Sequence, residues 1–245
     1  MPTKQKKGPV VDCVEVRTEG LIPADFLPFV ERMVNKQVVP ALRRVLGNSL
    51  ILPRYVTICE TLTSNGYVFV EINTSTWEIV SFDKPKVLMT PKKDALLFVL
   101  THEMAHYHEI ALRRRNSIRL CGLPAAFLWS EYFAQRVTWA TGHCSQQAME
   151  YGASTIDTEF KKQQDMLRPN GYYQVYQLMF IWAHSAVVAR WREDYDLNTI
   201  EFAETLDVGM LGGLYQTFPN WPSNSSIALT KLLSNLVELY GRNEG

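Results

Sequence analysis

The chain has 245 residues, of which 47% are hydrophobic and 11% aromatic. It can therefore fill a sizeable core and fold without disulfide bonds or structural metal ions. Lys plus Arg and Asp plus Glu both number 25, which gives no global charge that would attract nucleic acid or an anionic membrane. No C-x-x-C pair, apolar leader or apolar stretch of roughly 18 residues is present. We therefore expect a soluble, cytoplasmic protein, with neither nucleic acid nor membrane as a partner, and with four reduced cysteines: Cys13, Cys59, Cys121 and Cys144.

The first half of the chain predicts a short extended run, a helix and a small sheet. The extended run covers Val10–Val16, and a helical repeat of apolar residues follows over Ala24–Leu46, with a kink or break at Pro40 and an end at Gly47. β-branched and aromatic residues then predict four strands. The first two of these strands are predicted to form a hairpin around Asn65-Gly66. The four strands are Tyr55–Cys59, Tyr67–Ile72, Trp77–Phe82 and Lys86–Met89.

A long helix is predicted next, over Pro91–Arg115, with Thr90 as its N-cap. Its stretch Ala95–Leu100 is apolar all round, as expected of a helix buried in the core. Three arginines, 113–115, close its end, where cations meet the helix dipole favourably. A second helix follows Gly122 and Pro124 and continues to about Cys144.

Beyond this point the chain is predicted to be mostly helical. The expected segments are Gln146–Leu167, Tyr172–Glu193, Thr199–Leu206 and Ile227–Tyr240. We expect an α+β, mostly helical protein, with a core at residues 1–145 and a helical C-terminal part at 146–245.

The middle of the long helix carries the pattern H-E-x-x-H as His102-Glu103-Met104-Ala105-His106. Residues i and i+4 share one face of a helix, so His102 and His106 can reach one ion, with Glu103 beside a metal-bound water. This spacing is typical of zinc hydrolases. His108 lies about 240° around the helix from His102 and is expected to point elsewhere.

A catalytic zinc ion usually takes three protein ligands, so the two histidines need a partner. The metzincin pattern fails, because Glu109 and Leu112 occupy its glycine and last histidine positions. Glu109 is one turn too far along the axis to complete the ligand set, although it can lie behind the ligands. Glu131 is the first acid downstream, in the middle of an apolar helical stretch where its charge needs compensation, and Ala134 allows a close helix approach. We therefore nominate Glu131 as the third ligand.

The motif His102-Glu103-x-x-His106 followed by Glu131-x-x-Ala134 resembles the gluzincin-type metallopeptidases, and most closely the ImmA/IrrE-like (minigluzincin) family. The resemblance spans about residues 55–142. It implies a zincin-like core, with a small sheet packed on the H-E-x-x-H helix and a second helix that bears the glutamate. It also implies zinc bound by His102, His106 and Glu131, with Glu103 as the catalytic carboxylate. The neighbours of the second histidine depart from the family pattern, and no helix-turn-helix domain is recognisable.

The function expected on these grounds is hydrolysis of a peptide bond by zinc-activated water, with Glu103 as general base. His184 is a candidate for stabilising the oxyanion, the alternative being an ordinary core histidine, and His143 is expected to cap a helix end. A peptide or protein substrate is expected to add a strand along Tyr67–Ile72, unless that segment is simply an ordinary amphipathic strand.

Two rival interpretations remain. One is a non-catalytic zincin-fold protein with a binding or regulatory role. The other treats the histidines as structural and places no zinc in the protein. Neither the substrate nor the oligomeric state leaves a pattern in the sequence.

Overall fold

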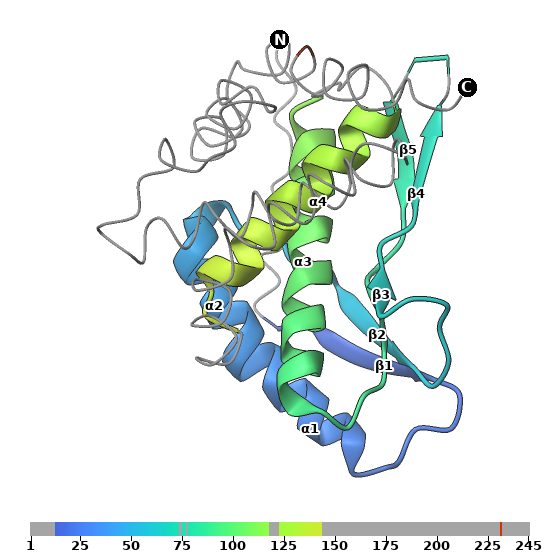
Figure 1. Cartoon of the computed structure of the whole chain (residues 1–245), viewed down its shortest axis with the longest axis vertical. Helices are drawn as coiled ribbons and strands as arrows, with labels where there is room; N and C mark the ends of the chain where they lie inside the picture. The colour runs from blue at the N-terminus through green and yellow to red at the C-terminus, as the bar shows by residue number, and fades with distance from the viewer. Residues whose placement is uncertain (1–12, 74, 77, 118–122, 144–230, 232–245) are drawn as a thin grey trace, which may run out of the picture.

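The computed structural model describes residues 13–73, 75–76, 78–117, 123–143 and 231. It combines helices with two small sheets, which confirms the α+β class for this part of the chain (Figure 1). The strands are β1 (Glu15–Glu19), β2 (Tyr55–Cys59), β3 (Gly66–Tyr67), β4 (Val70–Asn73), β5 (Glu78–Phe82) and β6 (Lys86–Leu88). The α-helices are α1 (Phe26–Met33), α2 (Val39–Leu46), α3 (Lys93–Arg115) and α4 (Leu123–Ala140). The helices predicted after residue 145, and His184 with them, lie outside the described residues.

The larger sheet has four strands in the order β1-β2-β6-β3. β1 and β6 run parallel to β2 on its two sides, and β3 pairs antiparallel with β6 at the edge. Strands with parallel neighbours are usually covered on both faces, and Val56, Ile58 and Val87 are indeed completely buried. β4 and β5 form a separate antiparallel pair whose residues are half-buried or exposed.

The expected hairpin between Tyr55–Cys59 and Tyr67–Ile72 is wrong. The first segment is the inner strand β2, and the second is divided between β3 and β4, which belong to different sheets. Asn65-Gly66 forms no two-residue hairpin turn, because Gly66 is already in β3 and the Asn65 carbonyl accepts a hydrogen bond from the Leu88 N–H. The hairpin lies one segment later, between β4 and β5.

The first helix continues through Pro40 without a break. α1 passes into a π-helical turn, Val34–Val38, and this turn passes directly into α2, which has Pro40 in its first turn. A proline lacks an N–H and clashes with the carbonyl four residues earlier. The helix accommodates Pro40 through the π-helical turn just before it. Gly47, with φ of 66°, ends the helix as expected. We call residues 26–46 the N-terminal helical rod.

α3 begins at Lys93, two residues later than predicted. Thr90 does not cap it, although its hydroxyl accepts a 3.3 Å hydrogen bond from the Lys92 N–H. The buried segment of α3 also lies closer to its C-terminal end than expected. Ala95 is exposed, whereas every residue from Leu100 to Arg113 is buried. The motif therefore lies in the deepest part of the helix.

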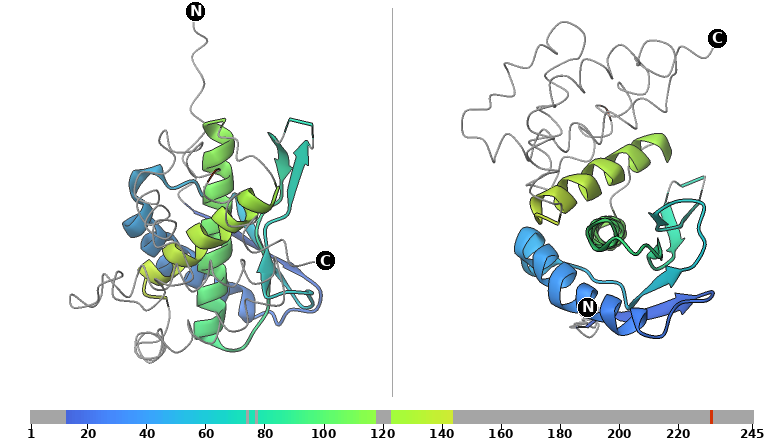
Figure 2. Two further views of the ribbon diagram at one scale, coloured as in Figure 1. Left: turned by 45° about the horizontal axis from the view of Figure 1, so that its top comes forward. Right: turned by 60° about the horizontal axis from the view of Figure 1, so that its bottom comes forward.

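The surroundings of α3 explain this burial. The right-hand view of Figure 2 shows α3 nearly end-on at the centre of the described residues, with the N-terminal helical rod, α4 and the strands on three sides of it. Leu96, Leu100 and Met104 belong to the common hydrophobic core and are completely buried. Among the described residues, no helix is both long and apolar enough to reach across a lipid bilayer.

Candidate metal centre

Two imidazoles of α3 face each other one helical turn apart. The Nε2 atoms of His102 and His106 are separated by 3.0 Å, and both residues are buried. Residues at i and i+4 of a helix lie above one another on one face, so local geometry alone brings the two rings together. The pairing agrees with the spacing predicted from the sequence.

α4 brings Glu131 to the same point. Its Oε2 atom lies 3.5 Å from Nε2 of His102 and 3.4 Å from Nε2 of His106. The side chain is buried, and Ala134, one turn further along α4, is completely buried as well. The three residues nominated as ligands therefore converge, and their ligand atoms all lie within 4.8 Å of one another.

This geometry fits a metal ion. Tetrahedral zinc with bonds of about 2.0–2.2 Å holds its ligand atoms about 3.3–3.6 Å apart, close to the separations of 3.0, 3.4 and 3.5 Å found here. Oε2 of Glu131 is also buried without a hydrogen-bond partner of ordinary geometry among the described residues. A buried oxygen of this kind is costly unless a cation satisfies it. His102, His106 and Glu131 thus form a group that could hold a metal ion.

The electrostatics keep Glu131 ionised. Burial opposes its charge, but the attraction of His106 and the nearness of both imidazoles outweigh burial and hold the pKa of Glu131 well below its usual range. The carboxylate is therefore present as an anion that can bind a cation.

Glu103 lies beside this cluster and is only 6% exposed to solvent. Burial raises the pKa of Glu103 to about 7, against the opposing attraction of His102. The backbone of β3 packs directly on its side chain: a Cβ added to Gly66 would lie 2.7 Å from the Glu103 Cγ. Only a glycine lets the strand approach Glu103 this closely, and sequence reasoning assigned Gly66 to a turn instead.

A second layer of polar groups supports His106. Its Nδ1 atom lies 2.8 Å from the Ser130 hydroxyl oxygen. A proton on Nδ1 that is donated to Ser130 leaves the Nε2 lone pair directed at the cluster. Ser130 was missed in the sequence, where nothing but its position next to Glu131 marks it.

Glu109 does not join the cluster and lies behind it, as the sequence suggested. It is fully buried and accepts a 3.1 Å hydrogen bond from the guanidinium of Arg113, one turn along α3. Burial raises the pKa of Glu109, while Arg113, then His106 and then Ser130 act in the opposite direction. Arg113, expected to be an ordinary helix-end cation, is therefore a buried residue with an ion-pair partner.

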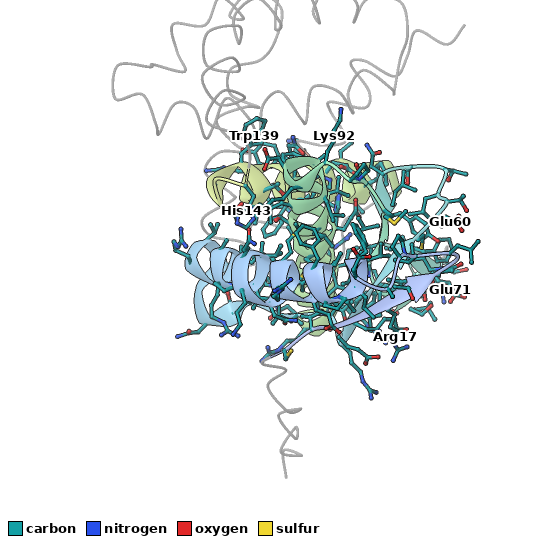
Figure 3. All side chains as sticks on the ribbon, turned by 90° about the horizontal axis from the view of Figure 1, so that it is seen from below. Arg17, Glu60, Glu71, Lys92, Trp139 and His143 are labelled. Atoms are coloured by element: carbon teal, nitrogen blue, oxygen red, sulfur yellow. The ribbon has the colours of Figure 1, made fainter. Side chains whose placement is uncertain are left out.

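The other described histidines stay outside the cluster. Nδ1 of His108 accepts a 3.0 Å hydrogen bond from the Ile51 N–H, and burial lowers the pKa of His108 to about 4, so it is a neutral structural residue. His143 does not cap α4 as predicted. Figure 3 shows it at the end of α4, toward the N-terminal helical rod, and its Nδ1 lies 2.8 Å from the Thr101 hydroxyl. That hydroxyl donates to the Leu97 carbonyl, so the Nδ1–H of His143 donates to Thr101.

A cavity of about 530 Å³ opens onto the cluster. Its walls come from the segment that joins β3 to β4, from one face of α3 and from the N-terminal end of α4, which lies toward the β4–β5 pair (Figures 1 and 2). His102, Glu103 and Glu131 line it together with apolar residues such as Tyr67 and Phe127. Part of the predicted edge strand, Tyr67–Ile72, therefore lies across the cavity from the metal ligands.

Comparison with protein-family models, curated proteins and solved structures finds no match for this chain.

Proposed function

We propose that this protein is a zinc-dependent peptidase with a zincin-like core. The observation that carries the proposal is the buried His102, His106 and Glu131 cluster, with a second carboxylate, Glu103, beside it on the wall of a cavity. The order of elements also supports it, since small strands precede the H-E-x-x-H helix and a glutamate-bearing helix follows it.

The donor set favours zinc as the metal. Two imidazole nitrogens and one carboxylate oxygen make up a common ligand set of catalytic zinc sites, in which the fourth position is left for water or substrate. When bound, zinc supplies a Lewis acid and lowers the pKa of a bound water toward about 7. His102 and His106 must be neutral to bind, and the contact between Ser130 and Nδ1 of His106 favours the required tautomer.

Glu103 is the residue that we assign to proton transfer. As a carboxylate it accepts a proton from the attacking water, and it then returns that proton to the leaving amine. A general base works best when its pKa is close to the working pH, and burial brings the pKa of Glu103 to about 7. A nearby cation further favours the carboxylate form that the base requires. The backbone at Gly66 limits the movement of the side chain.

The cavity suits an extended peptide. β3 is an edge strand of the larger sheet, and the segment from Gly66 to Val70 lines the cavity opposite α3. A peptide that pairs with this backbone gains main-chain hydrogen bonds, while its side chains enter the apolar part of the cavity. We propose that the Tyr67–Ile72 segment orients the substrate in this way. Its first residue, Tyr67, belongs to β3, and its last three, 70–72, belong to β4.

Metal analysis of purified variants tests the ligand set. Wild type and Glu103→Gln should each bind one zinc ion per chain, whereas His106→Ala and Glu131→Ala should lose it, because each removes a ligand. His143→Ala is the matched control, since it removes a histidine that lies outside the cluster. Stoichiometric zinc in both ligand variants would falsify the proposed site.

Cleavage assays test the chemistry. Wild type and Glu103→Gln are incubated with a peptide library made from a digested proteome, and products are identified by mass spectrometry. Loss of general-base catalysis should lower the rate by about 10²–10⁴-fold in Glu103→Gln. Glu31→Gln removes an exposed carboxylate of α1, away from the cavity lining, and should cut like wild type. A folded, zinc-loaded wild type that cuts nothing would favour the non-catalytic alternative.

A further inference from the structure

One face of α3 connects the metal cluster to a buried arginine. His106, Ile110 and Arg113 follow one another at i, i+4 and i+7, and all three line the same cavity. Seven residues of α-helix rise about 10 Å. The cavity therefore extends from the metal ligands at one end to Arg113 at the other.

Arg113 is unusual for a residue at the end of a helix. It is only 5% exposed, although its neighbours Arg114 and Arg115 are exposed. Among the described residues its guanidinium has one hydrogen-bond partner, the Glu109 carboxylate, and its Nε atom has none. A guanidinium carries five N–H donors, so it retains the capacity to bind a second acceptor.

Charge is distributed unevenly along the cavity. The acidic residues that line it, in the described part of the chain, are Glu103 and Glu131, both at the metal end. Arg113 is the cation that lines the other end, and the exposed Arg114 and Arg115 follow it directly in the chain. Between the two ends the walls are apolar and include Ile110, Ala126 and Phe127.

We propose that the Arg113 end of the cavity binds a carboxylate of the peptide substrate, two or three residues from the bond that is cut. The distance follows from the geometry, because an extended peptide covers about 10 Å in three residues. Arginine suits this task, since its planar fork matches a carboxylate. The carboxylate is either an Asp or Glu side chain or the free C-terminus of the peptide. This inference rests on the proposed peptidase function and assigns a substrate class to it.

The inference also accounts for the arginine cluster, which the proposed chemistry leaves unused. Arg113 is buried and lines the cavity, so a ligand must enter the cavity to meet it. The Glu109 carboxylate holds the guanidinium in place without using all of its donors. Arg114 and Arg115, outside the cavity lining, add positive charge near that end, which attracts an acidic peptide.

The first experiment compares cleavage preferences in the peptide library. Wild type should cut bonds that have Asp or Glu, or a free C-terminus, two or three residues away. An amidated copy of the library separates the two sources, because amidation removes only the C-terminal preference. The double variant Arg113→Gln with Glu109→Gln removes both partners of this ion pair, so that neither charge is left buried alone, and it should lose the preference. Arg32→Gln is the control, since it removes an exposed arginine of α1 that does not line the cavity.

The second experiment measures binding without cleavage. Three pools of fluorescein-labelled pentapeptides, random except at one fixed position, are titrated with zinc-loaded Glu103→Gln protein. The first pool has a fixed Glu and an amidated C-terminus, and the second has a fixed Gln and an amidated C-terminus. The third has a fixed Gln and a free C-terminus. Fluorescence anisotropy should show about ten- to a hundredfold tighter binding of a carboxylate-bearing pool, the effect expected of a hydrogen bond to a charged group. This comparison needs no change at Arg113, so it holds even if the double variant does not fold.

The outcomes separate the inference from the function. Cleavage that depends on Glu103 but shows no carboxylate preference overturns the inference and leaves the peptidase intact. A preference that survives in a folded double variant also overturns it. Tighter binding of a carboxylate-bearing pool by a protein that cuts nothing supports the carboxylate site and removes the peptidase function instead.

Discussion

Two parts of the buried interior differ in the kind of side chain that they contain. Around the N-terminal helical rod and the larger sheet, the interior is apolar, with Val30, Leu42 and Ile58 completely buried. Between α3 and α4 it holds charged groups, among them Glu109 and Glu131. Apolar burial stabilises a fold directly, whereas buried charges are costly even when they are paired. The difference indicates that the first part maintains the fold and the second serves the site.

The first prediction concerns the apolar part. Leu42→Ala should lower the free energy of unfolding by about 2–5 kcal/mol, because it leaves a cavity in a closely packed core. The folded variant should still bind one zinc ion per chain. Urea unfolding and metal analysis measure the two effects. Leu21→Ala, at a residue that is 84% exposed, is the control and should change stability by less than about 0.5 kcal/mol. Loss of zinc from folded Leu42→Ala would contradict the separation of the two parts.

The second prediction concerns the pH dependence of stability. His108 has a pKa lowered to about 4 by burial, from an ordinary value of 6.5. As the pH falls from 6.5 to 4, the unfolded chain gains a proton that the folded chain does not, so stability is lost on acidification. Wild type should therefore lose about 3 kcal/mol relative to His108→Gln over this range.

Urea unfolding of both metal-free proteins at several pH values tests this. Glutamine does not titrate, so the difference between the two curves isolates the histidine. Curves that stay parallel from neutral pH to pH 4 would show that His108 is not buried as a neutral group.

The third prediction concerns the contact between β3 and Glu103. Gly66→Ala places a methyl group against the Glu103 side chain, since the added Cβ lies 2.7 Å from Cγ. Displacing a catalytic group by about 1 Å can cost on the order of 10²-fold in rate. We expect this loss in turnover, with zinc content unchanged. In the Glu103→Gln background the same substitution should cost little more, because the group that it displaces is already inactive. Equal losses in both backgrounds would contradict the role assigned to Gly66.

The smallest predicted effect concerns the support of His106. Ser130→Ala removes the partner of its Nδ1 atom and should weaken zinc binding by about 10–100-fold. Competition with a chelator of known affinity measures this change. Thr138→Val is the matched control on α4, because the Thr138 hydroxyl is also buried but bonds to the Ala134 carbonyl of its own helix. Identical zinc affinities in all three proteins would remove Ser130 from the site.

The features predicted correctly from the sequence are those that local geometry decides. His102 and His106 share a helical face whatever the rest of the fold does, and Gly47 ends its helix through its own backbone conformation. Glu131 could be nominated because a carboxylate within an apolar helical stretch needs a partner. Its position is confirmed, while its role as a zinc ligand stays a prediction.

The features that were missed depend on partners far apart in the chain. The pairing of β2 with β1 and β6 is non-local, and an apolar strand carries no mark of its neighbours, so a hairpin was expected instead. Gly66 and Ser130 matter only because other elements pack against them. In the sequence Arg113 resembles a solvated helix end, and only the cavity and the contact with Glu109 distinguish it. Sequence patterns thus predict which side chains can act, and the fold decides which of them meet.

The location of Glu131 on a different helix from the two histidines has a consequence for the architecture of the chain. It lies 25 positions after His106, so metal loading would close a loop of that length as a disulfide does. A covalent cross-link over a loop of this size restricts the unfolded chain by about 3–4 kcal/mol in the chain-entropy description. The same three side chains would then form a reversible cross-link between α3 and α4, and a chelator that removes the metal would weaken the association of the two helices.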